Sequence, residues 1–280
     1  FGSKKATKDL IKQIEEFKPD VIHLHNIHGY YVNIEILFHY LKQHPEIKKI
    51  WTLHDCWSFT GHCAHYTYRK CNKWQTCCNG NCSNKKEYPK SWFSNVKSNF
   101  KRKKGIFNNV DNMILVTPSK WLKKEVEKSY LKDYPIEVIN NGVDTNVFKP
   151  TQSNIKQQCG IEDKKVILGV SSVWNKMKGL DTFIELSKEL DNQYQIVLIG
   201  LNKKQIEQLP CNIIGISRTE NVQELVKWYS AAYVFLNPTL EDTYPTTNLE
   251  AIACGTPVVT FNTGGSPESA FAGEDNIIEK

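Results

Sequence analysis

Short apolar runs alternate with stretches of helical periodicity along the whole chain. Buried β-strands are predicted by the apolar runs at 20–25, 50–53, 113–117, 136–139, 166–170, 195–199, 213–215, 234–236 and 257–261. Amphipathic helices are predicted between them, at 34–41, 121–130, 180–190, 222–232 and 246–254. Because strands that alternate with helices form parallel sheets, the pattern predicts an α/β fold whose ligands gather at the carboxyl ends of the strands.

A turn-rich segment separates the two series of strands. The sequence NNGVDTNVFKP at 140–150 lacks apolar periodicity and ends in proline. We place the linker at about 144–153 and predict a first domain over 1–146 and a second over 147–280. Since the chain starts with Phe1 and ends just after an apolar pair, we expect a piece of a longer protein, cut inside a domain at both ends.

Composition narrows the class of protein. The 280 residues are 40% hydrophobic and carry a net charge of +6, which suits an anionic ligand or surface without requiring nucleic acid. No run of about 18 apolar residues predicts a membrane span. The first 17 residues have the pattern of a charged amphipathic helix rather than a signal peptide, so we expect a cytoplasmic protein.

The segment 234–268, VFLNPTLEDTYPTTNLEAIACGTPVVTFNTGGSPE, carries the clearest candidate chemistry. Its predicted helix begins near Thr246, Thr247 and Asn248, where free N–H groups and the positive end of the helix dipole suit a phosphate.

Two carboxylates accompany this helix start, Asp242 before it and Glu250 within it. Carboxylates accept hydrogen bonds from sugar hydroxyls, so a phosphate flanked by hydroxyl-rich rings, a nucleotide sugar, is the predicted ligand. In the alternative interpretation, Thr247 and Glu250 form a capping box and Asp242 is a solvated loop acid.

Other polar residues follow further predicted strands. His25 follows the first strand, and His54 and Asp55 follow the second, so all three are expected at one sheet edge. A single histidine is usually structural, but two at successive strand ends are stronger candidates for a site. In the second domain, Lys178 is the penultimate residue of the loop SSVWNKMKG, which follows a predicted strand. Its ammonium suits a diphosphate, and the alternative is an ordinary surface lysine.

A cysteine-rich insert occupies 61–89 and holds five of the nine cysteines. In a reducing compartment, four thiolates can hold a structural zinc ion. The predicted ligand set is Cys63, Cys71, Cys78 and Cys82; Cys77 is spare, and His62 and His65 are alternates. The alternatives are a packed cysteine-rich loop or disulfides.

A basic segment at 85–104 follows the insert, with eight Lys or Arg residues against one acid. Aromatic residues recur in it at helical spacing. In one interpretation, the lysines of this segment contact the anionic inner face of the cell membrane peripherally. The other, which we favour for the aromatic residues, is a helix that packs them on the domain core and leaves its lysines solvated.

Several of these motifs together resemble one family. The run DTYPTTNLEAIACGTPVV, followed by GGSPE, resembles the donor-site signature of the retaining GT-B glycosyltransferases of family 4, in which two acids are separated by seven residues. Asp242 and Glu250 have this spacing, although the family's usual first acid is Glu, and the adjacent Glu241 is an alternative. The family's arginine before Lys178 is missing or is replaced by Lys176, since Val173 stands in its register. PDVIHLHN, WTLHD and NGVDTNVF are similar to the family's first-domain segments, and the cysteine insert resembles an exopolysaccharide (colanic-acid-type) subgroup.

The resemblance implies a GT-B fold: two Rossmann-like domains with parallel sheets facing across a cleft, here truncated in the N-terminal domain and at the C-terminal end. It implies a hexosyltransferase-type enzyme that moves a sugar, with retention, from a nucleotide-sugar donor to a hydroxyl of a glycan or lipid-linked glycan in bacterial surface polysaccharide synthesis. No catalytic cofactor is expected, so any zinc would be structural. We expect this piece alone to be inactive.

The resemblance also implies roles for the candidate residues. Glu250 would hold the ribose hydroxyls, and Asp242, or Glu241, the transferred sugar. Lys178 and the N–H groups at 246–248 would stabilise the leaving diphosphate.

On the first domain, His54 would face the donor phosphate and the transferred sugar. His25 and Asp55 would lie on the acceptor side.

Two other functions remain as alternatives at the level of sequence. A zinc-containing nucleic-acid-binding protein would use the cysteine insert and the basic segment, but the second domain would then need another explanation. A catalytically inactive GT-B relative would bind sugar without turnover.

Overall fold

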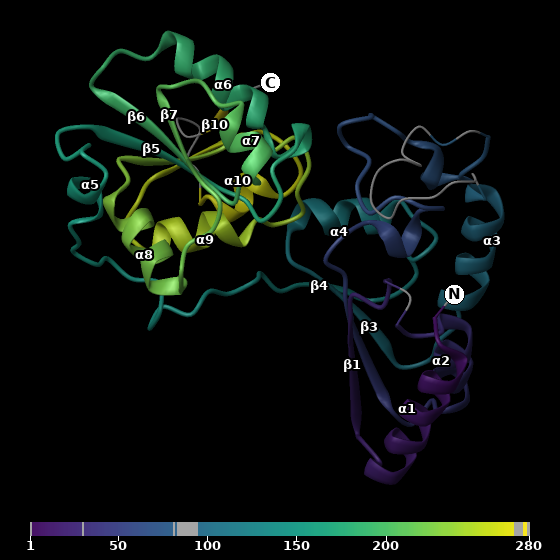
Figure 1. The fold of residues 1–280 in the computed structure, drawn as a ribbon. Coiled ribbons are helices and arrows are strands. Elements are labelled where there is room, and N and C mark those ends of the chain that lie inside the picture. The colour runs from purple at the N-terminus through teal and green to yellow at the C-terminus, as the bar shows by residue number, and fades with distance from the viewer. Residues whose placement is uncertain (1, 30, 81, 83–94, 272–276, 279–280) are drawn as a thin grey trace. The chain divides into compact units, whose positions relative to one another are not determined.

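The computed structural model describes residues 2–29, 31–80, 82, 95–271 and 277–278 (Figure 1). The chain divides into two compact units, Phe1–Asn140 and Asn141–Lys280, called here the first and second unit. The division lies a few residues before the one expected from the sequence.

The first unit is built on a four-stranded parallel sheet in the order β1-β2-β3-β4. The strands are β1 (Val21–His25), β2 (Lys48–Thr52), β3 (Met113–Thr117) and β4 (Ile136–Val138). The helices are α1 (Lys4–Phe17), α2 (Ile34–Gln43), α3 (Val96–Phe107) and α4 (Lys120–Glu127), with short 3₁₀ turns η1 (Trp57–Phe59) and η2 (Lys73–Gln75). Ser119 caps α4 by accepting a hydrogen bond from the Leu122 N–H.

The second unit is built on a six-stranded parallel sheet in the order β10-β9-β8-β5-β6-β7. Its strands are β5 (Lys165–Val170), β6 (Tyr194–Ile199), β7 (Ile213–Ile216), β8 (Val234–Asn237), β9 (Val258–Phe261) and β10 (Ile277–Ile278). Its helices are α5 (Ile155–Gln158), α6 (Leu180–Glu189), α7 (Lys203–Glu207), α8 (Val222–Ala231), α9 (Thr246–Ala253) and α10 (Ser266–Ser269), with a 3₁₀ turn η3 (Lys176–Lys178).

The strand order creates a switch point beside β5. The chain runs outward from β5 through β6 and β7, then returns to place β8 on the other side of β5. The loops after the neighbouring strands β5 and β8 therefore leave the sheet in different directions. Parallel sheets bind their ligands in the crevice between two such loops.

Each unit has its own buried core. In the first, Phe38, Trp51 and Phe107 pack edge to face or tilted around one another, with ring centroids 4.7–5.4 Å apart. In the second, residues of β5, β6 and β8 pack against both layers of helices. Separate cores are what two domains require.

The basic segment corrects one expectation. Residues 83–94 lie outside the described residues, so the expected helix is seen only as α3. Within it Phe100 and Phe107 are buried, as predicted, but Lys103 is not solvated: it is only 4% exposed. Its ammonium lies 4.0 Å from the centre of the Trp57 ring and donates a hydrogen bond to the Trp57 carbonyl, which offsets part of the cost of burial.

Among the described residues, no helix combines the length and the apolar character that crossing a bilayer requires.

Candidate active site

The start of α9 presents backbone N–H groups that no side chain caps. Pro245 occupies the N-cap position and makes no side-chain hydrogen bond to the helix. The backbone N–H groups of Thr246, Thr247 and Asn248 are among the four that a helix start leaves without internal partners. The arrangement suits an anion, because these groups and the helix dipole point the same way.

Glu250 does not close this helix start. Its carboxylate accepts a hydrogen bond of 2.8 Å from the Tyr229 hydroxyl on α8, so the capping-box interpretation is wrong. Burial raises the pKa of Glu250, and the Tyr229 hydrogen bond opposes that rise. The sequence does not predict a role for Tyr229, because nothing in the spacing along the chain links it to Glu250.

The side chain and the backbone of Asn248 have different roles. Its side-chain amide is fully buried and donates to the Ser269 hydroxyl at 2.9 Å, while its oxygen accepts from Asn237 at 2.8 Å. The side chain therefore joins β8 to α10, and only the backbone N–H is left for a ligand. Thr246 is exposed, and Thr247 is half-buried.

Lys178 and Asp242 meet beside the switch point. The Lys178 ammonium lies 2.7 Å from Asp242 Oδ2, and Asp242 Oδ1 accepts from the Tyr244 N–H at 3.2 Å. The two loops are fastened to each other, since the Leu240 N–H donates to the Met177 carbonyl at 2.7 Å. The structure thus brings together two predicted residues 64 positions apart, a cation that suits a diphosphate and a carboxylate that suits a hydroxyl. Glu241, the alternative acid, is half-buried in the same loop.

The first unit collects three histidines at the carboxyl ends of β1 and β2. His25 Nδ1 lies 2.9 Å from His54 Nε2, and the His23 and His25 rings are 4.1 Å apart. Burial, followed by the nearby His25, lowers the pKa of His54, so its imidazole favours the neutral form. His23 escaped the sequence analysis, although its position two residues before His25 places it on the same face of the strand.

Asp55 is held by its own neighbours. It lies 2.8 Å from His28 Nε2 and accepts a 2.8 Å hydrogen bond from the Trp57 N–H. Burial alone would raise the pKa of Asp55, but His28 and this backbone N–H hold it below its usual value. Asp55 therefore orients the loop after β2 in this structure.

Comparison with known proteins assigns both units to glycosyltransferases. Residues 3–147 match a family described as Glycosyltransferase Family 4, and residues 164–279 match one described as Glycosyl transferases group 1. The chain belongs to glycosyltransferase family 4.

Individual members of the family are distant from this chain. The D-inositol 3-phosphate glycosyltransferase of Corynebacterium jeikeium is 26% identical over 194 residues, which are 62% of this chain and 46% of that protein. WcaC of Escherichia coli, whose name assigns it provisionally to colanic acid biosynthesis, is 29% identical over 132 residues, or 45% of this chain and 32% of that protein. The chain spans about half or less of the length of these curated relatives.

Solved structures show the fold of the family. Sucrose-phosphate synthase from Thermosynechococcus elongatus matches with a TM-score of 0.69 at 17% identity, covering 98% of this chain and 63% of that chain. Anabaena HepE in complex with UDP matches with a TM-score of 0.65 at 16% identity, covering 98% and 67%. The predicted GT-B class, two Rossmann-like halves with parallel sheets, is confirmed.

The cysteine insert of this family 4 chain packs on the core of the first unit. Cys63 is buried there, and Cys71, Cys77 and Cys78 are half-buried against the same core. No disulfide occurs within the described part of the chain. In that part, no group of three or more His, Cys, Asp or Glu residues is arranged to hold a metal ion. Zinc binding by Cys63, Cys71, Cys78 and Cys82 stays a prediction.

Proposed function

We propose that this chain is part of a glycosyltransferase that moves a sugar from a nucleotide-sugar donor to a hydroxyl group of a glycan or lipid-linked glycan. The observation that carries the proposal is the grouping, in the second unit, of the Lys178–Asp242 pair with the uncapped start of α9. Asp242 lies four residues before Thr246, where α9 begins. Cationic and N–H donors beside a carboxylate match a diphosphate attached to a sugar.

The chemistry assigned to these groups is stabilisation of the leaving diphosphate. Negative charge develops on it as the bond to the sugar breaks, and fixed donors lower the energy of that state without reorganising. The N–H groups at 246–248 and the Lys178 ammonium supply such donors. Asp242, released from Lys178 when the diphosphate binds, is free to accept hydrogen bonds from the transferred sugar. Glu250 is assigned the ribose hydroxyls.

The first unit is assigned the acceptor. A neutral His54 imidazole can accept a hydrogen bond from a sugar hydroxyl and orient it for attack. Retention of the anomeric configuration, hexosyl specificity and a role in surface polysaccharide synthesis are part of the proposal. The last is supported by the similarity to WcaC.

A uridine nucleotide is the first probe of the donor site, since HepE structures hold UDP and UDP-glucose. We expect UDP, UDP-glucose or a GDP- or ADP-sugar to raise the melting temperature of the chain, because a ligand that binds only the folded state stabilises it. Glu250→Gln should reduce this shift by the equivalent of about tenfold in affinity, since one charge-assisted hydrogen bond is lost.

Glu189→Gln, which removes the same charge from an exposed position on α6, is the matched control and should keep the full shift. The donor assignment fails if no nucleotide sugar shifts either the chain or a longer form of the protein. The assignment of the ribose to Glu250 fails if both variants respond alike. Binding without sugar transfer by the longer form would identify an inactive relative.

A further inference from the structure

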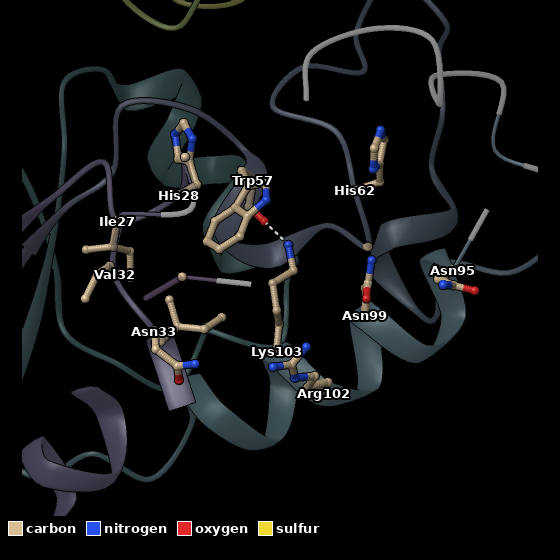
Figure 2. A pocket seen from close by; sticks show the side chains of 14 residues that line it. Ile27, His28, Val32, Asn33, Trp57, His62, Asn95, Asn99, Arg102 and Lys103 are labelled. Carbon is tan, nitrogen blue, oxygen red and sulfur yellow. Dashed lines mark hydrogen bonds between the residues drawn. The ribbon is translucent and has the colours of Figure 1, made fainter. Parts of the chain in front are cut away.

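A cavity of about 320 Å³ lies within the first unit, at the low end of the range of small-molecule pockets. Its walls come from the loop after β1, the loop around η1 and one face of α3 (Figure 2). The residues that line the cavity do not include His23, His25 or His54.

The described polar lining of the cavity holds two cationic side chains, of which Arg102 is already paired with Glu35, whose carboxylate lies 2.5 Å from the Arg102 Nε. Asn95, Asn99, Arg102 and Lys103 recur at helical spacing, so they share one face of α3. His62 also lines the cavity, from the loop after η1. Among the described residues that line the cavity there is no Asp or Glu. Because no described lining residue is acidic, the cavity would not repel a phosphate or a carboxylate.

Two buried groups in this lining lack partners that an anion would supply. His62 is 9% exposed, and its buried Nε2 has no hydrogen-bond partner among the described residues. Lys103 is 4% exposed, and within the described residues no carboxylate forms an ion pair with it. A buried polar atom without a partner is costly, and the Lys103 ammonium has the Trp57 carbonyl and ring as partners but no ion-paired countercharge in the described chain. An anion would supply that countercharge and a partner for His62.

The opposite wall of the cavity is largely apolar, with His28 and Asn33 as its polar side chains. Ile27, Val32 and Ile34 line it, and the Trp57 ring lies between this wall and Lys103. A ligand with a charged end and a compact, less polar body, such as a sugar ring, fits a cavity with these two sides.

We propose that this cavity binds the oxyanion, phosphate or carboxylate, of a sugar-sized ligand. The oxyanion lies toward Lys103 and His62, and the ring lies toward Ile27 and Trp57. The identification of this ligand as the acceptor of the transferase rests on the proposed function; the binding itself does not.

Calorimetric titration of the chain with glucose 6-phosphate, glucuronate and glucose, at one ionic strength, tests the cavity. At about pH 6, at least one charged sugar should bind about tenfold more tightly than glucose, because the Lys103 ammonium, whose pKa burial lowers to about 7, then acts on it in a partly buried site. Preference between the two charged sugars identifies the oxyanion.

Asn99→Asp places a carboxylate in the lining and should weaken binding of the charged sugar about tenfold. The half-buried position on the helix surface tolerates an isosteric change, so the fold should survive. Ser98→Asp adds the same charge to an exposed position of α3 outside the cavity and should leave the affinity within about twofold. Lys103→Met, which keeps the buried stem, should also abolish the preference over glucose.

The proposal is overturned if the charged sugars bind no better than glucose, or if Asn99→Asp and Ser98→Asp weaken them equally. Neither result depends on the donor site. If a charged sugar binds here while no nucleotide sugar binds the second unit, the cavity stands and only its role as an acceptor site is lost.

Discussion

Burial of the Glu250 carboxylate, which belongs to the candidate donor site, lowers the stability of the folded chain. Its carboxylate is half-buried and has one described hydrogen bond, from Tyr229, where an exposed carboxylate would be fully hydrated. The resulting rise in its pKa means that the folded protein prefers the protonated form more than the unfolded chain does. Ionisation of Glu250 therefore costs folding free energy.

This cost predicts a pH dependence. Because the folded pKa lies above the ordinary value of 4.5, the cost is absent below that value, grows as the pH rises above it, and is complete once the pH exceeds the folded pKa. Glu250→Gln keeps an acceptor for Tyr229 and removes the charge. Its unfolding free energy should therefore rise relative to wild type between about pH 4 and pH 7. Urea unfolding of both proteins across that range measures the difference, and a constant or falling difference would contradict the prediction.

Lys103 marks the limit of what the sequence shows about single residues. A lysine in a basic segment predicts a solvated side chain, and its three charged neighbours on α3 are exposed as expected. Its burial depends on the Trp57 carbonyl, 46 residues earlier, and on the packing of η1 on α3. Contacts over that distance leave no periodic signal in the chain. The same holds for Tyr229 and Glu250.

At the scale of elements, the turn after β9 fixes the position of Asp242. Gly264 has a φ of 57°, and a Cβ atom there would lie 1.9 Å from the Asp242 carbonyl oxygen. The next N–H, of Gly265, donates to that same oxygen at 3.1 Å. Only glycine allows this approach, so the GGSPE motif serves the loop of Asp242 as well as α10.

Gly264→Ala should destabilise the chain by roughly 2–4 kcal/mol and abolish nucleotide-sugar binding, because the Asp242 loop must move. Gly160→Ala is a matched control, since Gly160 has a similar φ of 65° but nothing within 4 Å of its added Cβ. That variant should lose only about 1 kcal/mol and keep the donor site. Chemical denaturation and the melting-temperature shift measure the two effects. Equal losses in both variants would show that backbone strain, and not the contact with Asp242, sets the cost.

The strands were the most predictable elements. Each of the nine predicted strands is present, since short apolar runs rich in Val and Ile form the centres of parallel sheets. The short α5, α7 and α10 carry too few residues for a periodic pattern, and the sequence analysis did not identify them. The strand order is also absent from the pattern, and with it the reason why the loops of Lys178 and Asp242 are neighbours.

At the scale of the whole molecule, two separate cores imply two unfolding units. Multidomain chains depart from a single cooperative transition when each domain buries its own apolar surface. The donor residues all belong to the second unit, and the oxyanion cavity belongs to the first. A ligand for one unit therefore acts first on the stability of that unit.

Native-state hydrogen exchange tests this separation. A nucleotide sugar at about a hundredfold excess over its Kd should raise the opening free energy of amides in β5 and β6 by about 2.7 kcal/mol. Amides in β2 and β3 should change much less. Glu250→Gln at the same ligand concentration should show only about half of this rise in β5 and β6, about 1.4 kcal/mol, because a tenfold loss of affinity leaves a tenfold excess over its Kd. An equal rise in both sheets of the wild type would mean that the units unfold together.

The uncapped start of α9 has a consequence for how such a protein would change under selection. A serine or aspartate at the N-cap typically stabilises a helix by about 1 kcal/mol. Pro245 makes no such side-chain hydrogen bond, so α9 lacks this stabilisation. A population selected only for heat resistance would therefore drift toward a cap at this position. The new side chain would then occupy the N–H groups that the phosphate needs, and resistance to heat would be gained at the expense of turnover.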